Sequence, residues 1–322
     1  MRLKSFREKN SISEAHILLI SACLEEDKIL CEGLVRKWEE MVDISDLDYS
    51  SSRLVPYFLN HMQKIGLVSV YDNRLKIIYK HWWLNSKHLN FELHKITHEL
   101  SALGKEQVLY KGSSIKEHYE KPELRTMSDL DLLVRIKDVS DVIRILENLG
   151  YSHENALKHI SGTARTIYLD FFHSTNFVHK TNGTRIDLHW EVGSNCSKKL
   201  THLFWDNLIE HGGLAHLYKP KIAYEVFMIL IHAINSNSHD NLNWFLDIHM
   251  INQKFNTNFW IEVESIAKEE GVLDMFNEAC YMLREFGIYA PKPGLSTTTR
   301  TNIVLSEASF NNLNLFRKNQ IR

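Results

Sequence analysis

Two aspartates, Asp129 and Asp131, stand two residues apart near the middle of the chain, in the sequence SDLDLLV. Because side chains alternate along a β-strand, a strand here places both carboxylates on one face of a sheet and Leu130 and Leu132 on the other. Two neighbouring carboxylates repel each other unless a cation lies between them. A hard divalent ion such as Mg²⁺, which prefers oxygen ligands, is the natural partner. The pair therefore predicts a metal position on the surface of a sheet.

A third aspartate stands in another segment of alternating polar and apolar residues, TRIDLHW at positions 184–190. In a strand, Arg185, Asp187 and His189 share one face, and the apolar side chains share the other. The Asn-Gly pair at 182–183 predicts a hairpin turn that leads into this strand. Alone, Asp187 would be interpreted as a surface residue of a hairpin, but it can meet the aspartate pair if the apolar face is buried. His189 is a candidate phosphate or acceptor contact, with a structural histidine as the preferred interpretation.

A glycine-serine turn precedes the aspartate pair. Gly112 and Ser113 stand between a short apolar strand and a helical segment, where backbone N–H groups can bind a phosphate without a side chain in the way. Lys111 and Arg125 are the candidate cations for the same phosphate, and the planar guanidinium suits a pair of phosphate oxygens. Either cation could instead be a surface charge or the ion-pair partner of Glu123 or of the aspartates.

In this order, the motifs resemble the signature of the nucleotidyltransferase superfamily that includes the polymerase-beta-like enzymes and, within it, the family described as uncharacterised nucleotidyltransferases. The resemblance extends to residues 53–67 and, through His232, Trp244 and Asp247, to residues 229–251. It implies an α+β fold. In that fold a small mixed β-sheet nucleotidyltransferase core is flanked by N-terminal and C-terminal helical regions.

The resemblance also implies an activity. This is the metal-dependent transfer of a nucleoside monophosphate, with AMP preferred, from a nucleoside triphosphate (NTP) to a hydroxyl or similar group, releasing pyrophosphate. Asp129 and Asp131 would be ligands shared by two Mg²⁺ ions, which Mn²⁺ could replace, and Asp187 the third ligand on the side of the attacking group. The acceptor would be a small molecule, a peptide or a protein. The nucleotide-binding positions would be Lys111, Gly112, Ser113 and Arg125.

Two other functions stay open. One is a catalytically weak member of the same fold that binds a nucleotide or a partner protein, although three clustered carboxylates are costly to keep without a metal. The other is a metal phosphohydrolase that uses His232, His239 and Asp240, for which the sequence places no further ligands.

Three histidines, His88, His94 and His98, lie in a long segment with a helical pattern. The last two are four residues apart and share one helix face, as a pair of metal ligands would. A zinc protease helix needs a glutamate directly after the first histidine of such a pair, and this position is Lys95. We therefore interpret them as histidines on a half-exposed helix face.

Periodicity and turn residues divide the chain into four segments. These are an N-terminal helical region at 1–105, the core at 106–192, a C-terminal helical domain at 193–290, and a tail at 291–322 that is flexible or held by a partner. Helices are predicted at 11–42, 53–64 with Pro56 in the first turn, 73–103, 114–120, 138–149, 200–211, 222–236, 241–253, 259–270 and 273–286. Strands are predicted at 107–110, 128–134, 166–172, 175–180 and 184–191.

The composition limits the class of protein. The chain has 322 residues, of which 44% are hydrophobic and 24% charged, as in ordinary globular proteins. A net charge of −2 gives no basic face for a long nucleic acid. No apolar run approaches the roughly 20 residues that span a bilayer, and no signal peptide is evident. Four scattered cysteines fit a reducing compartment, so we expect a cytoplasmic protein without a membrane association.

Overall fold

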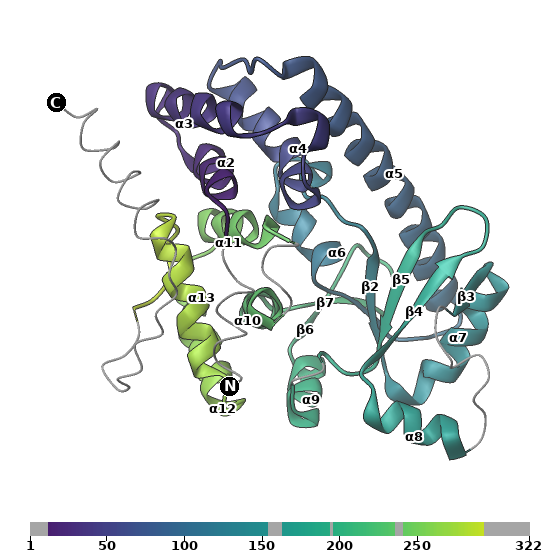
Figure 1. Cartoon of the computed structure of the whole chain (residues 1–322). Coiled ribbons are helices and arrows are strands. Elements are labelled where there is room, and N and C mark those ends of the chain that lie inside the picture. Colours follow the sequence, from purple (N-terminus) through teal and green to yellow (C-terminus); the bar gives the residue numbers. More distant parts are fainter. Residues whose placement is uncertain (1–11, 154–162, 194–195, 236–240, 293–322) are drawn as a thin grey trace.

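The structure is a computed structural model that describes residues 12–153, 163–193, 196–235 and 241–292. Most of the predicted tail, from residue 293 onward, lies outside the described residues, and so do His239 and Asp240. The match to the expected class is direct: helices flank a mixed sheet at both ends of the chain, which confirms the α+β fold (Figure 1). None of the described helices is both long enough and apolar enough to cross a membrane.

The N-terminal region is helical, as predicted, but its boundaries differ. Asp27 accepts hydrogen bonds from two backbone N–H groups at 2.9 Å, and this cap starts a new helix inside the predicted helix at 11–42. Asp48 caps the next helix by accepting from Ser51 N at 2.9 Å, so Pro56 lies inside that helix and not in its first turn. The helices are α2 (Glu14–Leu24), α3 (Lys28–Met41), α4 (Tyr49–Lys64) and α5 (Asp72–Ala102).

Seven strands in the described part of the chain form one mixed sheet, in the order β3-β4-β5-β2-β1-β7-β6. β2 is parallel to β5 and β1 is parallel to β7, whereas the other neighbours are antiparallel. The predicted hairpin at 182–183 is confirmed, since β4 and β5 pair antiparallel across it. The strands are β1 (Gln107–Leu109), β2 (Leu130–Val134), β3 (Tyr151–His153), β4 (Ser174–His179), β5 (Arg185–His189), β6 (Leu208–Glu210) and β7 (Leu217–Pro220).

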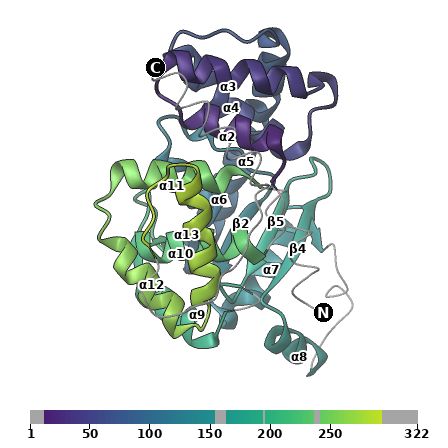
Figure 2. The same ribbon diagram turned by 60° about the vertical axis from the view of Figure 1, so that its left-hand side comes forward.

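The remaining helices surround this sheet. Helices α5 and α7 pack on one face, where one apolar core joins them to β2 and β5. The C-terminal helices lie toward the other face, with α10 nearest to the sheet (Figures 1 and 2). These helices are α6 (Gly112–Ile115), α7 (Val139–Asn148), α8 (Thr163–Phe171), α9 (Lys198–Asp206), α10 (Ile222–Asn235), α11 (Asn243–Lys254), α12 (Phe259–Glu269) and α13 (Leu273–Glu285).

One predicted strand is a helix. Residues 166–172 belong mostly to α8, and their apolar alternation is misleading. Tyr168 stacks on Phe172, four residues later, with ring centroids 4.2 Å apart. Ile167 and Phe171 are exposed on another side. Side chains four residues apart on a helix share a face, so the same apolar residues fit a helix.

One predicted helix is partly sheet. Helix α9 ends at Asp206, and residues 208–210 form β6 where the prediction extended a helix to 211. Gly212 and Gly213, both at positive φ, turn the chain into β7, which pairs with the edge of β1. Such short strands carry no alternation of their own, because pairing with a distant edge forms them. The sheet thus continues past residue 192. The division into four segments stays a prediction.

Candidate functional site

The register of β2 against β5 decides which polar side chains meet. Asp131 lies directly opposite Asp187, and Leu133 lies opposite His189. The alternate residues Leu130, Leu132, Ile186 and Leu188 are buried in the core on the α5 and α7 side, as the alternation predicted. Two of the three predicted aspartates therefore lie side by side, although they come from separate segments of the chain.

A histidine lies between these two carboxylates. Nε2 of His189 is 2.7 Å from Oδ2 of Asp187 and 3.3 Å from Oδ1 of Asp131. One ligand atom from each residue falls within 4.8 Å of the others, and among the described residues this is the group that could hold a metal ion. Oδ1 of Asp187 is buried and has no hydrogen-bond partner in that part of the chain. The donor set of two carboxylates and one imidazole fits a divalent ion.

Asp129 lines the same cavity but is not part of that group. Its Oδ1 accepts a hydrogen bond from Ser128 Oγ at 3.2 Å. Burial, followed by the negative charge of Asp131, raises the pKa of Asp129 above its usual value, against the opposing charges of Lys111 and Arg53. The three aspartates thus share one cavity, and a cation near Asp129 would relieve the repulsion.

Lys111 has an unusual backbone conformation and contacts a carboxylate. Its φ is +52°, a region that residues other than glycine rarely adopt, at a cost of about 1–3 kcal/mol. Its Nζ lies 2.7 Å from Oδ1 of Asp131. Burial alone would raise the pKa of Asp131, but the charge of Lys111 and the contact with His189 hold that pKa well below its usual value. The Asp187 pKa is also lowered, because His189 outweighs burial.

Gly112 starts α6 and lines the cavity. A Cβ at this position would lie 3.0 Å from Cγ of Met127 and 3.3 Å from Nη1 of Arg125, so a larger residue would force its neighbours to move. Ser113 is buried, and its Oγ has no hydrogen-bond partner among the described residues. The predicted turn therefore exists, with a close approach that explains the glycine.

Arg125 makes an ion pair, which is one of the alternatives open from the sequence, but its partner is Asp247 and not Glu123 or one of the three aspartates of the sheet. Its Nε and Nη2 donate to the two oxygens of Asp247 at 3.0 and 2.9 Å, and its Nη1 donates to Thr126 O at 2.6 Å. Tyr119 also donates to Asp247, at 2.6 Å. Arg125 is 5% exposed and Asp247 is 1% exposed. The guanidinium lines the cavity with its fork already occupied.

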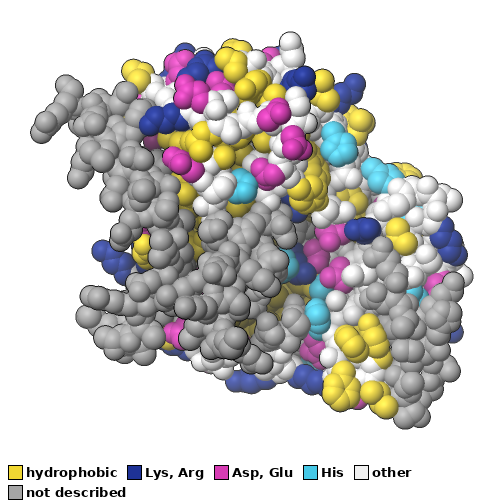
Figure 3. All heavy atoms as spheres, in the orientation of Figure 1, with side chains coloured by type: hydrophobic (Ala, Val, Ile, Leu, Met, Phe, Trp, Pro, Cys, Tyr) yellow, Lys and Arg dark blue, Asp and Glu magenta, His cyan; other side chains and the backbone are white. Residues whose placement is uncertain are grey.

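The cavity has a volume of about 520 Å³ and lies where three parts of the chain meet. On this face of the molecule, acidic and histidine side chains gather between the N-terminal helices and the sheet (Figure 3). The wall includes Tyr49 and Arg53 from α4, the carboxylates from the sheet, and residues from the C-terminal helices. The C-terminal contribution comes from Met228, Ile229, His232, Ala233, Asn235, Asn241, Trp244 and Asp247.

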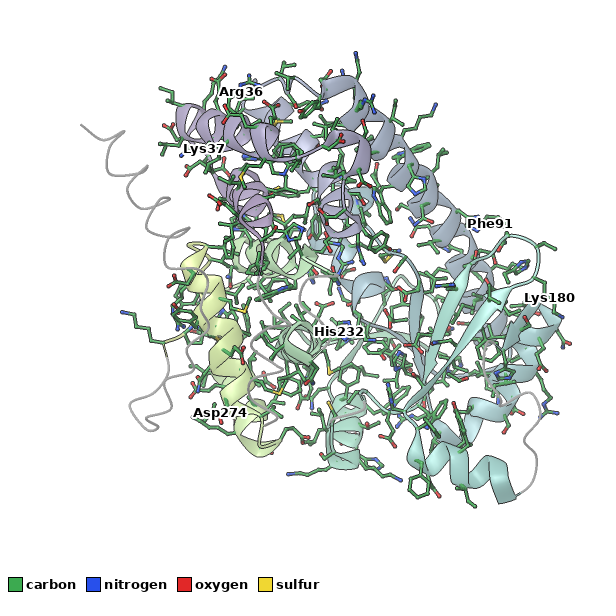
Figure 4. All side chains as sticks on the ribbon, viewed as in Figure 1. Arg36, Lys37, Phe91, Lys180, His232 and Asp274 are labelled. Atoms are coloured by element: carbon green, nitrogen blue, oxygen red, sulfur yellow. The ribbon has the colours of Figure 1, made fainter. Side chains whose placement is uncertain are left out.

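A smaller cavity of about 210 Å³ adjoins the first on the Asp187 side. Lys111, Asp187 and His232 line both cavities, while His173 and His189 line the smaller one. His232 projects from α10 toward the sheet (Figure 4). Burial, followed by the charge of Lys111, lowers the pKa of His232 to about 4, so its ring is neutral near pH 7. Asp187 therefore stands at the junction of two spaces.

Sequence reasoning did not identify every residue of this site. His189 was assigned mainly a structural role, yet it touches both aspartates. His232, Trp244 and Asp247 were noted only as part of a resemblance, and all three line the cavity. Arg53 was not singled out, because a lone arginine in a helical segment carries no motif.

The other histidines have different surroundings. His88 Nε2 lies 2.6 Å from Thr184 Oγ1, and the rings of His94 and His98 stack with centroids 6.1 Å apart. These contacts fit the interpretation of a half-exposed helix face. The proposed phosphohydrolase ligands His239 and Asp240 lie outside the described residues, while His232 belongs to the aspartate cavity.

Two comparisons with known proteins bear on this geometry. A family model described as "Uncharacterised nucleotidyltransferase" matches residues 37–287, which include α4, the whole sheet and the C-terminal helices that line the cavity. No curated protein matches the chain.

Proposed function

The chain belongs to the uncharacterised nucleotidyltransferase family, and from this premise we propose that it transfers a nucleoside monophosphate, preferably AMP, from an NTP to a hydroxyl or similar group, with release of pyrophosphate. The observation that carries the proposal is the register that sets Asp131 against Asp187, at the wall of a cavity that also contains Lys111 and Gly112. This arrangement combines carboxylates that can bind a metal with N–H groups that can bind a phosphate. An isolated hairpin on the protein surface would not bring these groups together.

We propose that Asp129, Asp131 and Asp187 hold two Mg²⁺ ions, with His189 as a neighbouring ligand or positioning group. The unpartnered Oδ1 of Asp187 and the raised pKa of Asp129 both fit a site that is completed by cations. When bound, the metal supplies a lowered pKa at the attacking hydroxyl and neutralises charge on the leaving pyrophosphate. Mn²⁺, which has similar oxygen preferences, would also fit.

The protein's own groups would position the two substrates. Backbone N–H groups at Gly112 and Ser113, with the ammonium of Lys111, would bind the triphosphate, because α6 starts at this turn. We assign the NTP to the larger cavity. Asp187 lines both cavities and would orient the attacking hydroxyl toward the α-phosphate. Arg125 would act through its ion pair, as a support for the cavity wall.

The smaller cavity supports a proposal about the acceptor. Its volume of about 210 Å³ suits a small molecule or a single side chain of a peptide or protein. Its wall combines histidines with apolar groups. The residues that line this cavity and not the larger one are His173, His189, Val192, Gly193, Cys196 and Ile231. A long nucleic acid would need a broad basic surface, and the net charge of −2 offers no general attraction for one.

One observation favours a second candidate, a catalytically weak member that binds a nucleotide or a partner. Asp131 already has a cation, Lys111 Nζ, at 2.7 Å, and this ion pair could replace a metal. The two candidates differ in chemistry. Isothermal titration with Mg²⁺ and each NTP, followed by a pyrophosphate assay with candidate acceptors, separates them. Pyrophosphate release supports transfer, whereas nucleotide binding with no release across the acceptor classes supports the second candidate.

A further inference from the structure

Arg53, on α4, is a buried cation for which the described residues supply no ion-pair partner. It is 7% exposed and lines the larger cavity. Among the described residues no ion pair within 4.0 Å joins it to an acidic group, while the nearby Asp247 has both oxygens engaged by Arg125. Burying an unpaired charge is costly, so such a residue needs a compensating anion.

The hydrogen bonds of Arg53 do not satisfy it. Nη2 donates to Thr126 O at the long distance of 3.4 Å, and Nε is buried with no partner in the described part of the chain. Its Cζ lies 5.6 Å from the ring centroid of Tyr49, which supplies a weak cation–π contact. A guanidinium has five N–H donors in a planar fork. Most of that capacity is unused.

The electrostatic surroundings also favour an anion at this position. Burial, followed by the positive charge of Arg125, lowers the pKa of Arg53, and the charges of Asp129 and Asp247 only partly oppose this. Two guanidinium groups therefore share a buried region in which Asp247 is paired with Arg125, while Asp129 acts on Arg53 without a direct ion pair. An incoming anion would relieve the repulsion between them.

Arg53 borders the cavity that we assign to the NTP and not the one that we assign to the acceptor. Its charge acts on Asp129, whereas the charges that act on Asp187 come from His189, Asp131 and Lys111. Arg53 lines the larger cavity and is absent from the wall of the smaller one. In both ribbon views α4 lies above α6, the helix that begins at Gly112 (Figures 1 and 2).

A second unpartnered donor lines the same cavity. Trp244, on α11, is 2% exposed, and its indole N–H has no acceptor among the described residues. A buried donor without an acceptor is costly, and a ligand oxygen would satisfy it. Arg53 and Trp244 come from opposite ends of the chain and contribute to one wall.

We propose that Arg53, assisted by the Trp244 indole N–H, binds the terminal phosphates of the NTP, because the fork of Arg125 is already engaged by Asp247. The identification of the anion as an NTP rests on the proposed function; the requirement for a polyphosphate does not. The N-terminal helical region then forms part of the NTP site, so residues of α4 and of the sheet contact the same ligand.

The test measures the binding of inorganic tripolyphosphate, ATP and AMP, each with Mg²⁺, by isothermal titration of the full chain. Arg53→Met should weaken tripolyphosphate and ATP at least about tenfold, because charge-assisted hydrogen bonds are lost, while AMP changes little. Arg53→Lys keeps the charge but loses the planar fork, so its affinities for tripolyphosphate and ATP should lie between those of the wild type and Arg53→Met. Arg74→Met, an exposed arginine on α5 outside this cavity, is the matched control and should bind all three as the wild type does.

Thermal unfolding distinguishes a ligand-binding role from a structural one. A structural arginine would lower the melting temperature when replaced, whereas removal of an unpaired buried cation should leave it unchanged or raise it. If Arg53→Met binds tripolyphosphate as tightly as the wild type, or if the wild type does not bind it, the inference is overturned whatever the activity. If binding depends on Arg53 but no pyrophosphate is released, the phosphate site stands and the proposed transfer fails.

Discussion

The two faces of the central sheet are made by the same strands but have opposite contents. On one face Leu130, Leu132 and Leu188 pack in the core beneath α5 and α7. On the other, Asp131 and Asp187 meet around His189, in reach of a cavity. Burial of the first face stabilises the fold. On the second face Lys111 and His189 lower the pKa of Asp131 and Asp187, whereas burial and the charge of Asp131 raise the pKa of Asp129, so an ionised Asp129 costs stability unless a cation is bound. Alternate residues of the same strands thus serve different purposes: one set packs in the core, and the other set forms the candidate site.

The largest expected effect is on the polar face. Asp129→Ala should lower turnover at least about a thousandfold, because a proposed ligand of the charge-neutralising metal is lost. The melting temperature should stay the same or rise, since the pKa of Asp129 is raised by burial and by Asp131. Pyrophosphate release measures the turnover, and thermal unfolding followed by circular dichroism measures the melting temperature. A variant that keeps most of its turnover would remove Asp129 from the mechanism.

The buried ion pair behind the cavity should respond differently. Asp247→Asn leaves Arg125 buried beside Arg53 without its ion-pair carboxylate, and we expect a loss of about 3–5 kcal/mol in the free energy of unfolding. Urea unfolding measures it. A loss below about 1 kcal/mol would show that Arg125 finds another partner, and the contrast between the two arginines would then disappear.

A cavity-creating substitution on the apolar face should destabilise the protein without altering its chemistry. Leu188 is 0% exposed, so Leu188→Ala should lower the free energy of unfolding by about 3 kcal/mol. Turnover per folded molecule should stay close to that of the wild type. Ile167→Ala, at a residue 51% exposed on α8, is the control and should cost less than about 0.5 kcal/mol. If Leu188→Ala lowered turnover as much as stability, the two faces would not be separable.

The smallest effect is expected at the turn. Gly112→Ala places a Cβ 3.0 Å from Met127 Cγ and 3.3 Å from Arg125 Nη1, which should cost about 1–2 kcal/mol of stability. ATP should bind less tightly, because the backbone donors move with the displaced turn. Urea unfolding and ATP titration measure both. Unchanged ATP binding with reduced stability would mean that the glycine serves packing alone.

The separation of the two faces was predictable from the sequence, because alternation in β2 and β5 already assigns each residue to a face. The hairpin at 182–183 and the fold class followed in the same way. What the sequence does not contain is register: nothing local states that Asp131 lies opposite Asp187 or that Leu133 lies opposite His189. Strand pairing across distant segments decides this.

Partners that lie far apart in the chain were also beyond the sequence. Arg125 pairs with Asp247 across 122 positions, and no periodicity connects them. The case for Arg53 as a phosphate ligand depends on its burial and on its unpartnered Nε, which no sequence pattern indicates. Likewise β7 forms because β1 offers an edge, and α8 uses apolar residues that fit either a strand or a helix. In each case tertiary contacts outweigh local preference.

The central claim is that the polar face binds a metal together with an NTP. The most direct measurement is isothermal titration of ATP into the wild type and into Asp131→Asn, each with Mg²⁺ and then with excess EDTA. We predict that the wild type binds ATP at least about tenfold more tightly with Mg²⁺ than with EDTA, and that Asp131→Asn abolishes this difference. Equal ATP affinities with Mg²⁺ and with EDTA in the wild type, or an undiminished Mg²⁺ effect in Asp131→Asn, would contradict the account.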